Sequence, residues 1–183
     1  MSDIISVSIL TDEVYVSFDP GENSNIGIAV FESEKGQTIW YGQIRLQDIQ
    51  PNLNIIAGRS KILAIICEDY RVFGHKARQH VGSRVETIQS IGVIKAFALG
   101  KHIPFVLQPS NILDIAQRLT QTKMPRDHSI SHSVSAFLHG AYYLIQQGTR
   151  KTALQEMHEA EESDQVAQAA QDVSSHPQST QKL

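Results

Sequence analysis

The sequence of 183 residues contains one cysteine, Cys67, and no apolar run of the length that a membrane helix needs. A single cysteine excludes a disulfide scaffold and any zinc site built on paired cysteines. A bilayer span takes about 20 consecutive apolar residues, so we expect no membrane partner. Residues 1–10 also lack the basic segment of a signal peptide, and we expect a reducing, cytoplasmic location.

The net charge of −3 is small, but the charges are unevenly distributed along the chain. Residues 70–126 contain nine Lys or Arg against two acids, whereas residues 1–69 contain ten acids against four Lys or Arg. Such a basic block either solvates a helix face or forms a surface that neutralises phosphates. The average charge therefore does not exclude a nucleic-acid partner.

The pattern of apolar residues predicts strands first and then alternating helices and strands. Turn residues around 19–25 and 33–37 separate the first strands, and residues 62–67 form a continuous apolar run that is typical of a central strand. This order favours an α/β fold with a mixed sheet. The predicted strands are 4–10, 14–18, 27–32, 38–46, 62–67 and 103–107, and the predicted helices are 83–99, 109–119 and 127–147.

Three further segments have weaker patterns. Residues 47–61 contain Pro51 and Gly58 and are predicted to form a loop with one helical turn, and residues 72–82 are predicted to form an exposed basic loop. From residue 149 the chain is rich in Ala, Gln and Glu and poor in large apolar residues. We therefore expect one domain over 1–148 and a mobile or partly helical tail over 149–183 that either is solvated or binds an unknown partner.

Two acids stand at the ends of predicted strands. Asp19 precedes Pro20 and Gly21, and Glu68 follows the apolar run together with Asp69. If the two strands are neighbours, Asp19 and Glu68 meet and supply the hard oxygen ligands that Mg²⁺ binds at phosphate sites. Each acid taken alone is also consistent with a turn or a solvated strand end.

The last predicted helix presents three histidines and a serine on one face. His128, His132, Ser135 and His139 are spaced by four, three and four residues, which places them along one side of a helix. This row is either a polar stripe satisfied within the core or the metal-binding edge of a site.

Four segments taken in order resemble the RuvC-type Holliday junction resolvases of the RNase H-like superfamily, in particular their phage-borne branch. The resemblance extends from about Val14 to Gly148, and the Asp-x-Gly turn alone is shared with actin-like ATPases, whose second glycine-rich phosphate loop is absent here. The segments are FDPGENSNIGIAVF at 18–31, IICEDYRVFG at 65–74, VLQPSN at 106–111 and HSVSAFLHGAYYL at 132–144.

The resemblance implies an RNase H-like five-stranded mixed sheet flanked by helices, and two Mg²⁺ or Mn²⁺ ions bound by Asp19, Glu68 and His132. Ser135 stands where the family has a second acid in the last helix, and a serine cannot supply the missing negative charge. Asp69, His128 and His139 are implied only as groups supporting these ligands. Three explanations stay open: histidines and water complete the metal shell, the serine was introduced to trap DNA, or the protein binds DNA without cutting it.

The implied activity is hydrolysis of phosphodiester bonds in four-way junctions and other branched DNA by a homodimer, with helix 83–99 at the dimer face. Asp19 would bridge the metals, Glu68 would hold one of them, and His132 and Ser135 would act on the side of the attacking water. An alternative is an inactive RNase H-like protein that only binds branched DNA. The residues expected to contact DNA phosphates are Arg71, Lys76, Arg78 and Arg84.

Overall fold

The computed structural model describes residues 11–21, 25–70 and 83–174, without the side chains of 83–85, 128–130 and 164–174. The chain divides into two compact units, Met1–Arg150 and Lys151–Leu183. Within the described residues, no helix is both long and apolar enough to cross a bilayer. The predicted strand at 4–10 and most of the predicted basic loop at 72–82 lie outside the described residues.

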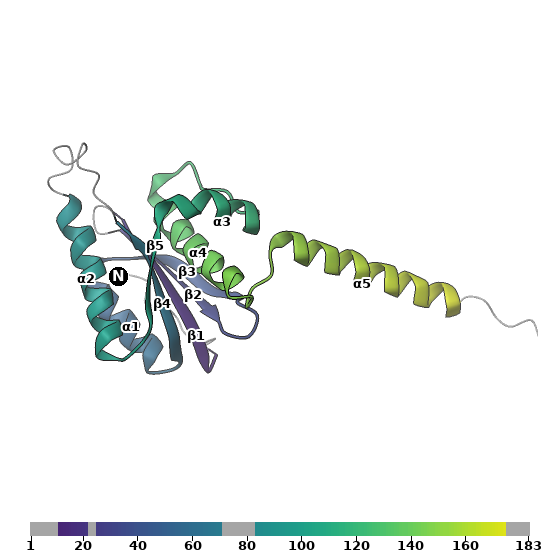
Figure 1. The fold of residues 1–183 in the computed structure, drawn as a ribbon, viewed down its shortest axis with the longest axis horizontal. Coiled ribbons are helices and arrows are strands. Elements are labelled where there is room, and N and C mark those ends of the chain that lie inside the picture. Colours follow the sequence, from purple (N-terminus) through teal and green to yellow (C-terminus); the bar gives the residue numbers. More distant parts are fainter. Residues whose placement is uncertain (1–10, 22–24, 71–82, 175–183) are drawn as a thin grey trace, which may run out of the picture. The chain divides into compact units, whose positions relative to one another are not determined.

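The first unit is built on a five-stranded sheet in the order β3-β2-β1-β4-β5 (Figure 1). β1 pairs antiparallel with β2 and β2 with β3, whereas β1–β4 and β4–β5 are parallel pairs. The predicted mixed five-stranded sheet is therefore confirmed. The strands are β1 (Glu13–Pro20), β2 (Ile26–Glu32), β3 (Thr38–Ile44), β4 (Lys61–Asp69) and β5 (Phe105–Pro109).

Helices cover both faces of this sheet. α1 (Ile49–Ala57) and α2 (Ser83–Gly100) lie on one side, and α3 (Leu113–Thr120) and α4 (His128–Gln146) lie on the other (Figure 1). Single 3₁₀ turns, η1 (Leu46–Asp48) and η3 (Ser110–Ile112), lead into α1 and α3. The helices predicted at 83–99, 109–119 and 127–147 are thus confirmed to within a few residues.

The loop predicted for residues 47–61 was wrong, because most of this segment is the helix α1. Pro51 is its third residue, where the missing N–H would have no partner inside the helix, so the proline does not disrupt it. Gly58 caps the carboxyl end of the helix. Ile49, Leu53 and Ile56 are fully buried, and this packing stabilises a helix whose sequence pattern is weak.

Alternation along β1 divides the interior into two layers. Val14, Val16 and Phe18 belong to the large core under α1 and α2, while Tyr15 packs with the smaller cluster under α4. Because side chains of a strand alternate between faces, Ser17 and Asp19 point to the α4 face. The polar side chains of β1 therefore lie where α4 crosses the sheet.

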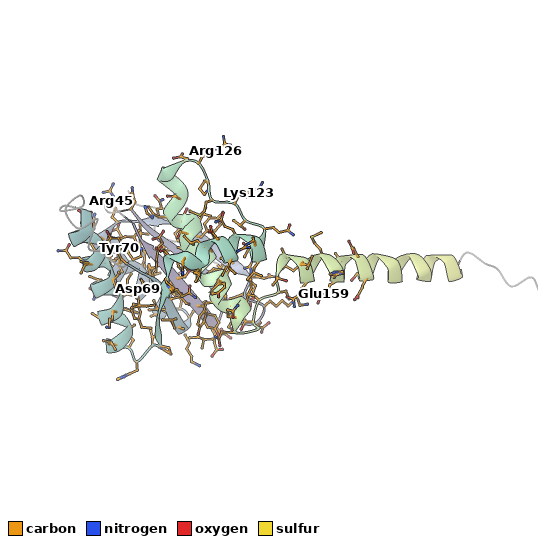
Figure 2. The ribbon with its side chains drawn as sticks, turned by 45° about the horizontal axis from the view of Figure 1, so that its top comes forward. Arg45, Asp69, Tyr70, Lys123, Arg126 and Glu159 are labelled. Atoms are coloured by element: carbon orange, nitrogen blue, oxygen red, sulfur yellow. The ribbon has the colours of Figure 1, made fainter. Side chains whose placement is uncertain are left out.

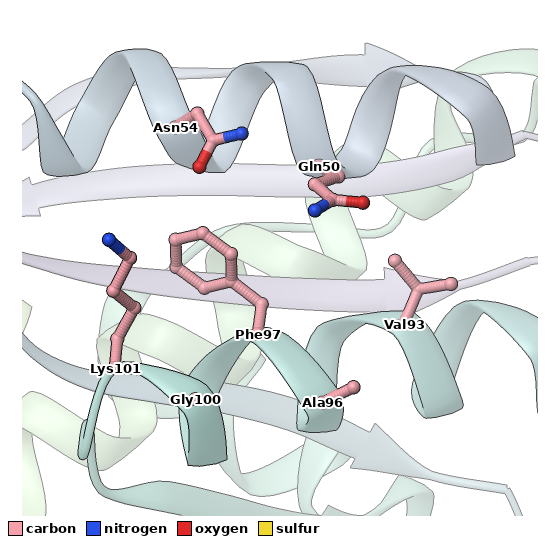
Figure 3. A pocket seen from close by; sticks show the side chains of 7 residues that line it. All are labelled: Gln50, Asn54, Val93, Ala96, Phe97, Gly100 and Lys101. Atoms are coloured by element: carbon pink, nitrogen blue, oxygen red, sulfur yellow. The ribbon is translucent and has the colours of Figure 1, made fainter.

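The apolar residues of α2 are only partly buried. Ile94 is fully buried and Phe97 nearly so, but Ile88 is 58% exposed and Leu99 is 63% exposed. α2 packs beside α1 around a shallow cavity of about 350 Å³ (Figure 3). The cavity is lined by Gln50, Asn54, Val93, Ala96, Phe97, Gly100 and Lys101.

The second unit contains the helix α5 (Ala153–Ser174). Lys151 and Glu159 form an ion pair within this unit, while Leu154 and Met157 are exposed. The tail predicted to be mobile or partly helical thus contains a helix of 22 residues. Neither its role nor its partner is tested by these contacts.

Candidate functional site

Three polar side chains form a row across the ends of β1, β4 and β5. Glu68 of β4 is registered with Gln108 of β5, and Asp19 of β1 comes directly after the registered pair Phe18 and Cys67. Side chains in register on neighbouring parallel strands point to the same face. The sequence predicted that Asp19 and Glu68 meet if their strands are neighbours. β1 and β4 are neighbours, so this condition holds.

α4 closes over this row and contributes two imidazoles. His132 Nδ1 lies 3.0 Å from Asp19 Oδ2, and His139 Nε2 lies 3.3 Å from Glu68 Oε2. Between them, the Ser17 hydroxyl donates a 2.6 Å hydrogen bond to the carbonyl of Ala136. Each carboxylate of the row therefore contacts one histidine of α4. His132 precedes the residue that accepts the Ser17 hydrogen bond, and His139 follows it.

Two glycines allow α4 to approach the sheet so closely. A Cβ on Gly27 would lie 1.9 Å from the carbonyl oxygen of His132, and one on Gly140 would lie 2.2 Å from the Phe31 ring. Any side chain at these positions would push the helix away from β1 and β2. Gly27 belongs to the motif at 18–31 and Gly140 to the motif at 132–144. Both glycines thus contribute to the site by letting α4 pack close to the sheet.

The second carboxylate–histidine pair is the more deeply enclosed. His139 is 0% exposed and its Nδ1 lies 2.9 Å from Gln108 Oε1. Although His139 Nε2 is close to Glu68, the pair does not have the geometry of a hydrogen bond. Burial raises the pKa of the Glu68 carboxyl, contact with His139 opposes this rise, and the charge of Asp19 adds to it.

Two buried polar atoms of α4 have no hydrogen-bond partner among the described residues. These atoms are Ser135 Oγ, in a residue that is 2% exposed, and His139 Nε2. Buried polar groups are nearly always satisfied, so these two atoms are available to a water molecule or another polar ligand. The predicted residues Asp19, Glu68 and His132 thus lie together, and Ser135 shares a face of α4 with His132 and His139 by its spacing.

The donor set fits a divalent ion held by few protein ligands. Among the described residues, no three His, Cys, Asp or Glu side chains are grouped closely enough to bind one metal ion. Mg²⁺, however, commonly binds one or two carboxylates and keeps several waters or substrate phosphates. Asp19 and Glu68 supply the carboxylates, and Ser135 Oγ supplies a neutral oxygen that would contact a bound water.

Comparison with known proteins identifies the architecture. RuvC of Thermus thermophilus in complex with a Holliday junction substrate matches over 76% of this chain and 99% of its own, with a TM-score of 0.53 and 12% identity. A second structure of Thermus thermophilus RuvC matches over the same shares, with a TM-score of 0.51 and 14% identity. The chain has the fold of RuvC. A scan of protein-family models and a search of curated proteins gave no match.

The RuvC fold confirms what the four ordered motifs predicted for the architecture. The identity to the solved RuvC structures is too low to carry more than the fold, so the phage-borne branch and the activity stay predictions. Within this fold the first motif forms β1 and β2, the second ends β4, the third ends β5, and the fourth forms α4.

Several predicted site residues are not placed at the site. Asp69 follows Glu68 in β4, so the alternation of the strand directs it to the opposite face of the sheet. The side chains of Arg84 and His128 are not described, although both residues lie within helices, α2 and α4. Arg71, Lys76 and Arg78 lie outside the described residues.

Sequence reasoning missed Gln108 and Arg45. Gln108 lies in the quoted VLQPSN motif, but its cross-strand register with Glu68 is a property of the sheet. Arg45 is exposed and follows β3, whose last residue Ile44 pairs with Ile26 beside the end of β1. Counting charges by segment placed Arg45 in the acidic part of the sequence. In the folded sheet, however, the end of β3 that precedes Arg45 is level with the end of β1 that carries Asp19.

Proposed function

We propose that this protein is a structure-selective endonuclease that hydrolyses phosphodiester bonds at four-way junctions and other branched DNA. The observation that carries the proposal is the convergence of Asp19 and Glu68, each in contact with a histidine of α4. The RuvC fold supports the choice of substrate, because one matching structure is described as a complex with a Holliday junction substrate.

In the proposed reaction, water adds to phosphorus and the bond to the 3′ oxygen breaks, which leaves a 5′-phosphate and a 3′-hydroxyl. When bound, Mg²⁺ or Mn²⁺ would lower the pKa of the attacking water and neutralise charge on the phosphate, and two such ions can act together. Asp19 and Glu68 would hold these ions. Asp19 also orients the His132 ring through Nδ1, so that this ring can act at the side of the attacking water.

Three exposed basic side chains lie on segments next to the elements of the site and support binding of DNA. Arg45 follows β3, and Lys123 and Arg126 project from the segment before α4, the helix that brings His132 to Asp19 (Figure 2). Contacts to phosphates position a duplex without reading its sequence, which suits a junction-selective enzyme. The predicted contacts at Arg71, Lys76, Arg78 and Arg84 stay part of this proposal.

A homodimer belongs to the same proposal, because a four-way junction has two-fold symmetry and each subunit would nick one strand. The exposed side of α2 supports this, since Ile88, Gly92, Ala96 and Leu99 recur every three or four residues and all are exposed. Apolar and small residues in such a stripe allow two copies of a helix to pack closely.

The second candidate function is binding of branched DNA without cleavage. The observation that favours it is Ser135, a buried hydroxyl that adds no negative charge beside Asp19 and Glu68. A site with fewer charges binds divalent ions less tightly.

Cleavage of a synthetic junction distinguishes the two functions. End-labelled four-way junction and linear duplex of the same sequence are incubated with the protein in Mg²⁺, in Mn²⁺ and in EDTA, with Asp19→Asn as control. The endonuclease gives symmetric nicks in the junction that require metal and are lost in the variant. Junction binding without nicks in either metal supports the second candidate, and absence of both binding and nicks contradicts both.

A further inference from the structure

Gln108 and His139 form a buried chain that ends on Glu68, and the proposed reaction gives neither residue a role. Gln108 is registered beside Glu68 on the neighbouring strand, and His139 reaches both side chains from α4. Both Gln108 and His139 are buried, whereas the side chain of Glu68 keeps 18% exposure toward the site. The chain thus runs from the interior to a carboxylate at the surface of the site.

The amide of Gln108 determines how the His139 ring is used. Its oxygen can only accept, so the 2.9 Å contact requires that His139 Nδ1 carries the proton and donates it. The ring is completely buried and lies in α4, which is anchored to β1 by the bond from Ser17 to Ala136. With Nδ1 donating to Gln108, Nε2 faces Glu68 Oε2 at 3.3 Å. Both of these atoms are acceptors in a neutral ring and an ionised carboxylate, so a proton shared between them is what joins the ring to Glu68.

A purely structural buried histidine would satisfy both ring nitrogens within the core. Here Nε2 is directed at a partly exposed carboxylate and lacks hydrogen-bond geometry with it in the absence of any ligand. Polar atoms of a functional site commonly become aligned only when the ligand is bound. The orientation of the His139 ring is therefore better explained by contact with the Glu68 carboxylate than by packing of the core.

We propose that Gln108 and His139 are positioning residues: Gln108 fixes the imidazole through Nδ1, and the imidazole holds the Glu68 carboxylate in its working orientation. This inference rests on the proposed function, since it assigns to Glu68 the role given there. Groups that orient a metal-binding carboxylate typically affect activity or metal affinity about 10–100-fold when they are removed.

The first arm of the test removes the acceptor from Gln108. Gln108→Met keeps the length of the side chain but leaves Nδ1 without an acceptor, whereas Gln108→Glu keeps an oxygen at that position. Gln117→Met is the matched control, because the Gln117 side chain accepts a hydrogen bond from the backbone N–H of Met124 in the segment after α3. It removes one glutamine hydrogen bond outside the site.

For cleavage of a four-way junction we expect kcat of Gln108→Met to fall about 10–100-fold, with KM for the junction within about twofold. Gln108→Glu keeps the acceptor but adds a buried negative charge beside Glu68, so it retains more kcat than Gln108→Met without reaching the wild type. Gln117→Met leaves kcat unchanged. Unchanged kcat in folded Gln108→Met overturns the positioning role, as does an equal loss in Gln117→Met.

The second arm reads the ring directly, so it does not depend on cleavage. Long-range ¹⁵N–¹H spectra of the histidine rings are recorded for the wild type, Gln108→Met and Glu68→Gln, and His139 is assigned by His139→Gln. We expect a protonated Nδ1 in the wild type, its perturbation in Gln108→Met and a change at Nε2 in Glu68→Gln.

The two arms separate this inference from the proposed function. If Glu68→Gln leaves both ring nitrogens of His139 unchanged, the positioning chain is wrong even where the wild type cleaves junctions. If the spectra respond as expected and the wild type cleaves nothing in either metal, the proposed function fails while the connection of Gln108 and His139 to Glu68 is supported. If Gln108→Met does not fold, Gln108→Glu and Glu68→Gln decide the same question.

Discussion

At the scale of single residues, the site is unusual in having two carboxylates with two histidines and a buried serine that has no hydrogen-bond partner among the described residues. Asp19 and Glu68 lie close enough that the charge of Asp19 adds to the effect of burial in raising the pKa of the Glu68 carboxyl. Contact with His139 opposes this rise in the pKa of the Glu68 carboxyl. Replacing Ser135 by an acid is therefore the most direct way to add a negative charge to the site by one substitution.

We predict that Ser135→Asp strengthens metal binding and lowers stability without metal. A third carboxylate at a residue that is 2% exposed adds repulsion and a buried charge, which together cost about 2 kcal/mol or more of unfolding free energy. Divalent ions should restore Tm and raise junction cleavage at least tenfold. Thermal melts with Mg²⁺, Mn²⁺ and EDTA, beside cleavage assays, measure both effects.

Ser90→Asp is the control for this substitution, because Ser90 is also a buried serine but lies on α2, on the side of the sheet opposite to α4. It should lower Tm by a similar amount with no recovery in metal. Unchanged cleavage in Ser135→Asp would show that the histidines suffice for activity.

At the scale of elements, the strands could be predicted from sequence because alternation and burial agree in each of them. Val14, Val16 and Phe18 of β1 face one core, and the continuous apolar run of β4 is buried on both faces. α1 could not be predicted, because Pro51 and Gly58 signal a break and only the packing of its apolar face makes the helix stable. Local patterns therefore determined the sheet but not the helix after β3.

The candidate site was predictable in part for the same reason. Asp19, Glu68 and the histidine row follow from strand ends and helical spacing, which are local properties. The role of Gln108 depends on the register of β5 with β4, and that of Arg45 on the return of β3 to the end of β1. Such neighbours across a sheet have no signature within one segment of sequence.

The close approach of α4 gives a prediction at this scale. Gly27→Ala places a Cβ 1.9 Å from the His132 carbonyl oxygen, so α4 must move and the contact between His132 and Asp19 is lost. We expect a loss of about 1–3 kcal/mol in unfolding free energy and a fall in cleavage. Urea unfolding checks it against Gly100→Ala, where the new Cβ meets nothing within 4 Å and stability should change by less than about 0.5 kcal/mol.

The turn between β2 and β3 gives a pH-dependent prediction. Burial by itself raises the pKa of the Glu32 carboxyl, but hydrogen bonds from backbone N–H groups lower it further, and the net pKa lies below the usual value. The donors are the N–H groups of Glu34, Lys35 and Gln37, at 2.8, 2.7 and 2.9 Å. A lowered pKa in the folded state means that ionised Glu32 stabilises the fold above its unfolded pKa, and that this contribution is lost as the pH falls through the folded value.

We therefore expect Glu32→Gln to lower the unfolding free energy by about 1 kcal/mol at pH 7, since hydrogen bonds to an ionised group are the stronger ones. The difference from the wild type should shrink as the pH falls below about 4. Urea titrations at both pH values measure it. Glu34→Gln is the control, because the exposed Glu34 carboxyl caps no backbone group in the described residues, and a loss that persists at low pH would contradict the assignment.

At the scale of the whole molecule, exposed basic side chains lie on the segments after β3 and before α4, next to the elements that carry the acids of the site. This arrangement suits DNA whose phosphates are held by Arg45, Lys123 and Arg126 while one bond approaches Asp19 and Glu68. We predict that replacing any of these three cations by alanine lowers the slope of log Kd for a junction against log salt by about one. Fluorescence anisotropy in Ca²⁺ measures this without cleavage.

Lys101→Ala is the control for the salt titration, because Lys101 is exposed at the end of α2 away from the site. Its slope should equal that of the wild type. Equal slopes for all four variants would place the DNA on another surface.

The proposed dimer is tested on α2. Leu99→Glu places a charge in the stripe of Ile88, Gly92, Ala96 and Leu99, so we expect sedimentation to change from a dimer to a monomer with unchanged circular dichroism. Ile115→Glu, at a partly exposed isoleucine of α3, serves as control and should stay dimeric. A wild type that sediments as a monomer at tens of micromolar contradicts the dimer.

The contact between His132 and Asp19 joins residues 113 positions apart in the chain. During synthesis on the ribosome, β1 and β4 emerge long before α4, so both carboxylates exist for most of translation without either imidazole. A nascent chain that stops before residue 128 has every strand of the sheet and no complete site. The candidate site is therefore complete only when synthesis of the domain is nearly finished, and premature termination yields fragments that lack it.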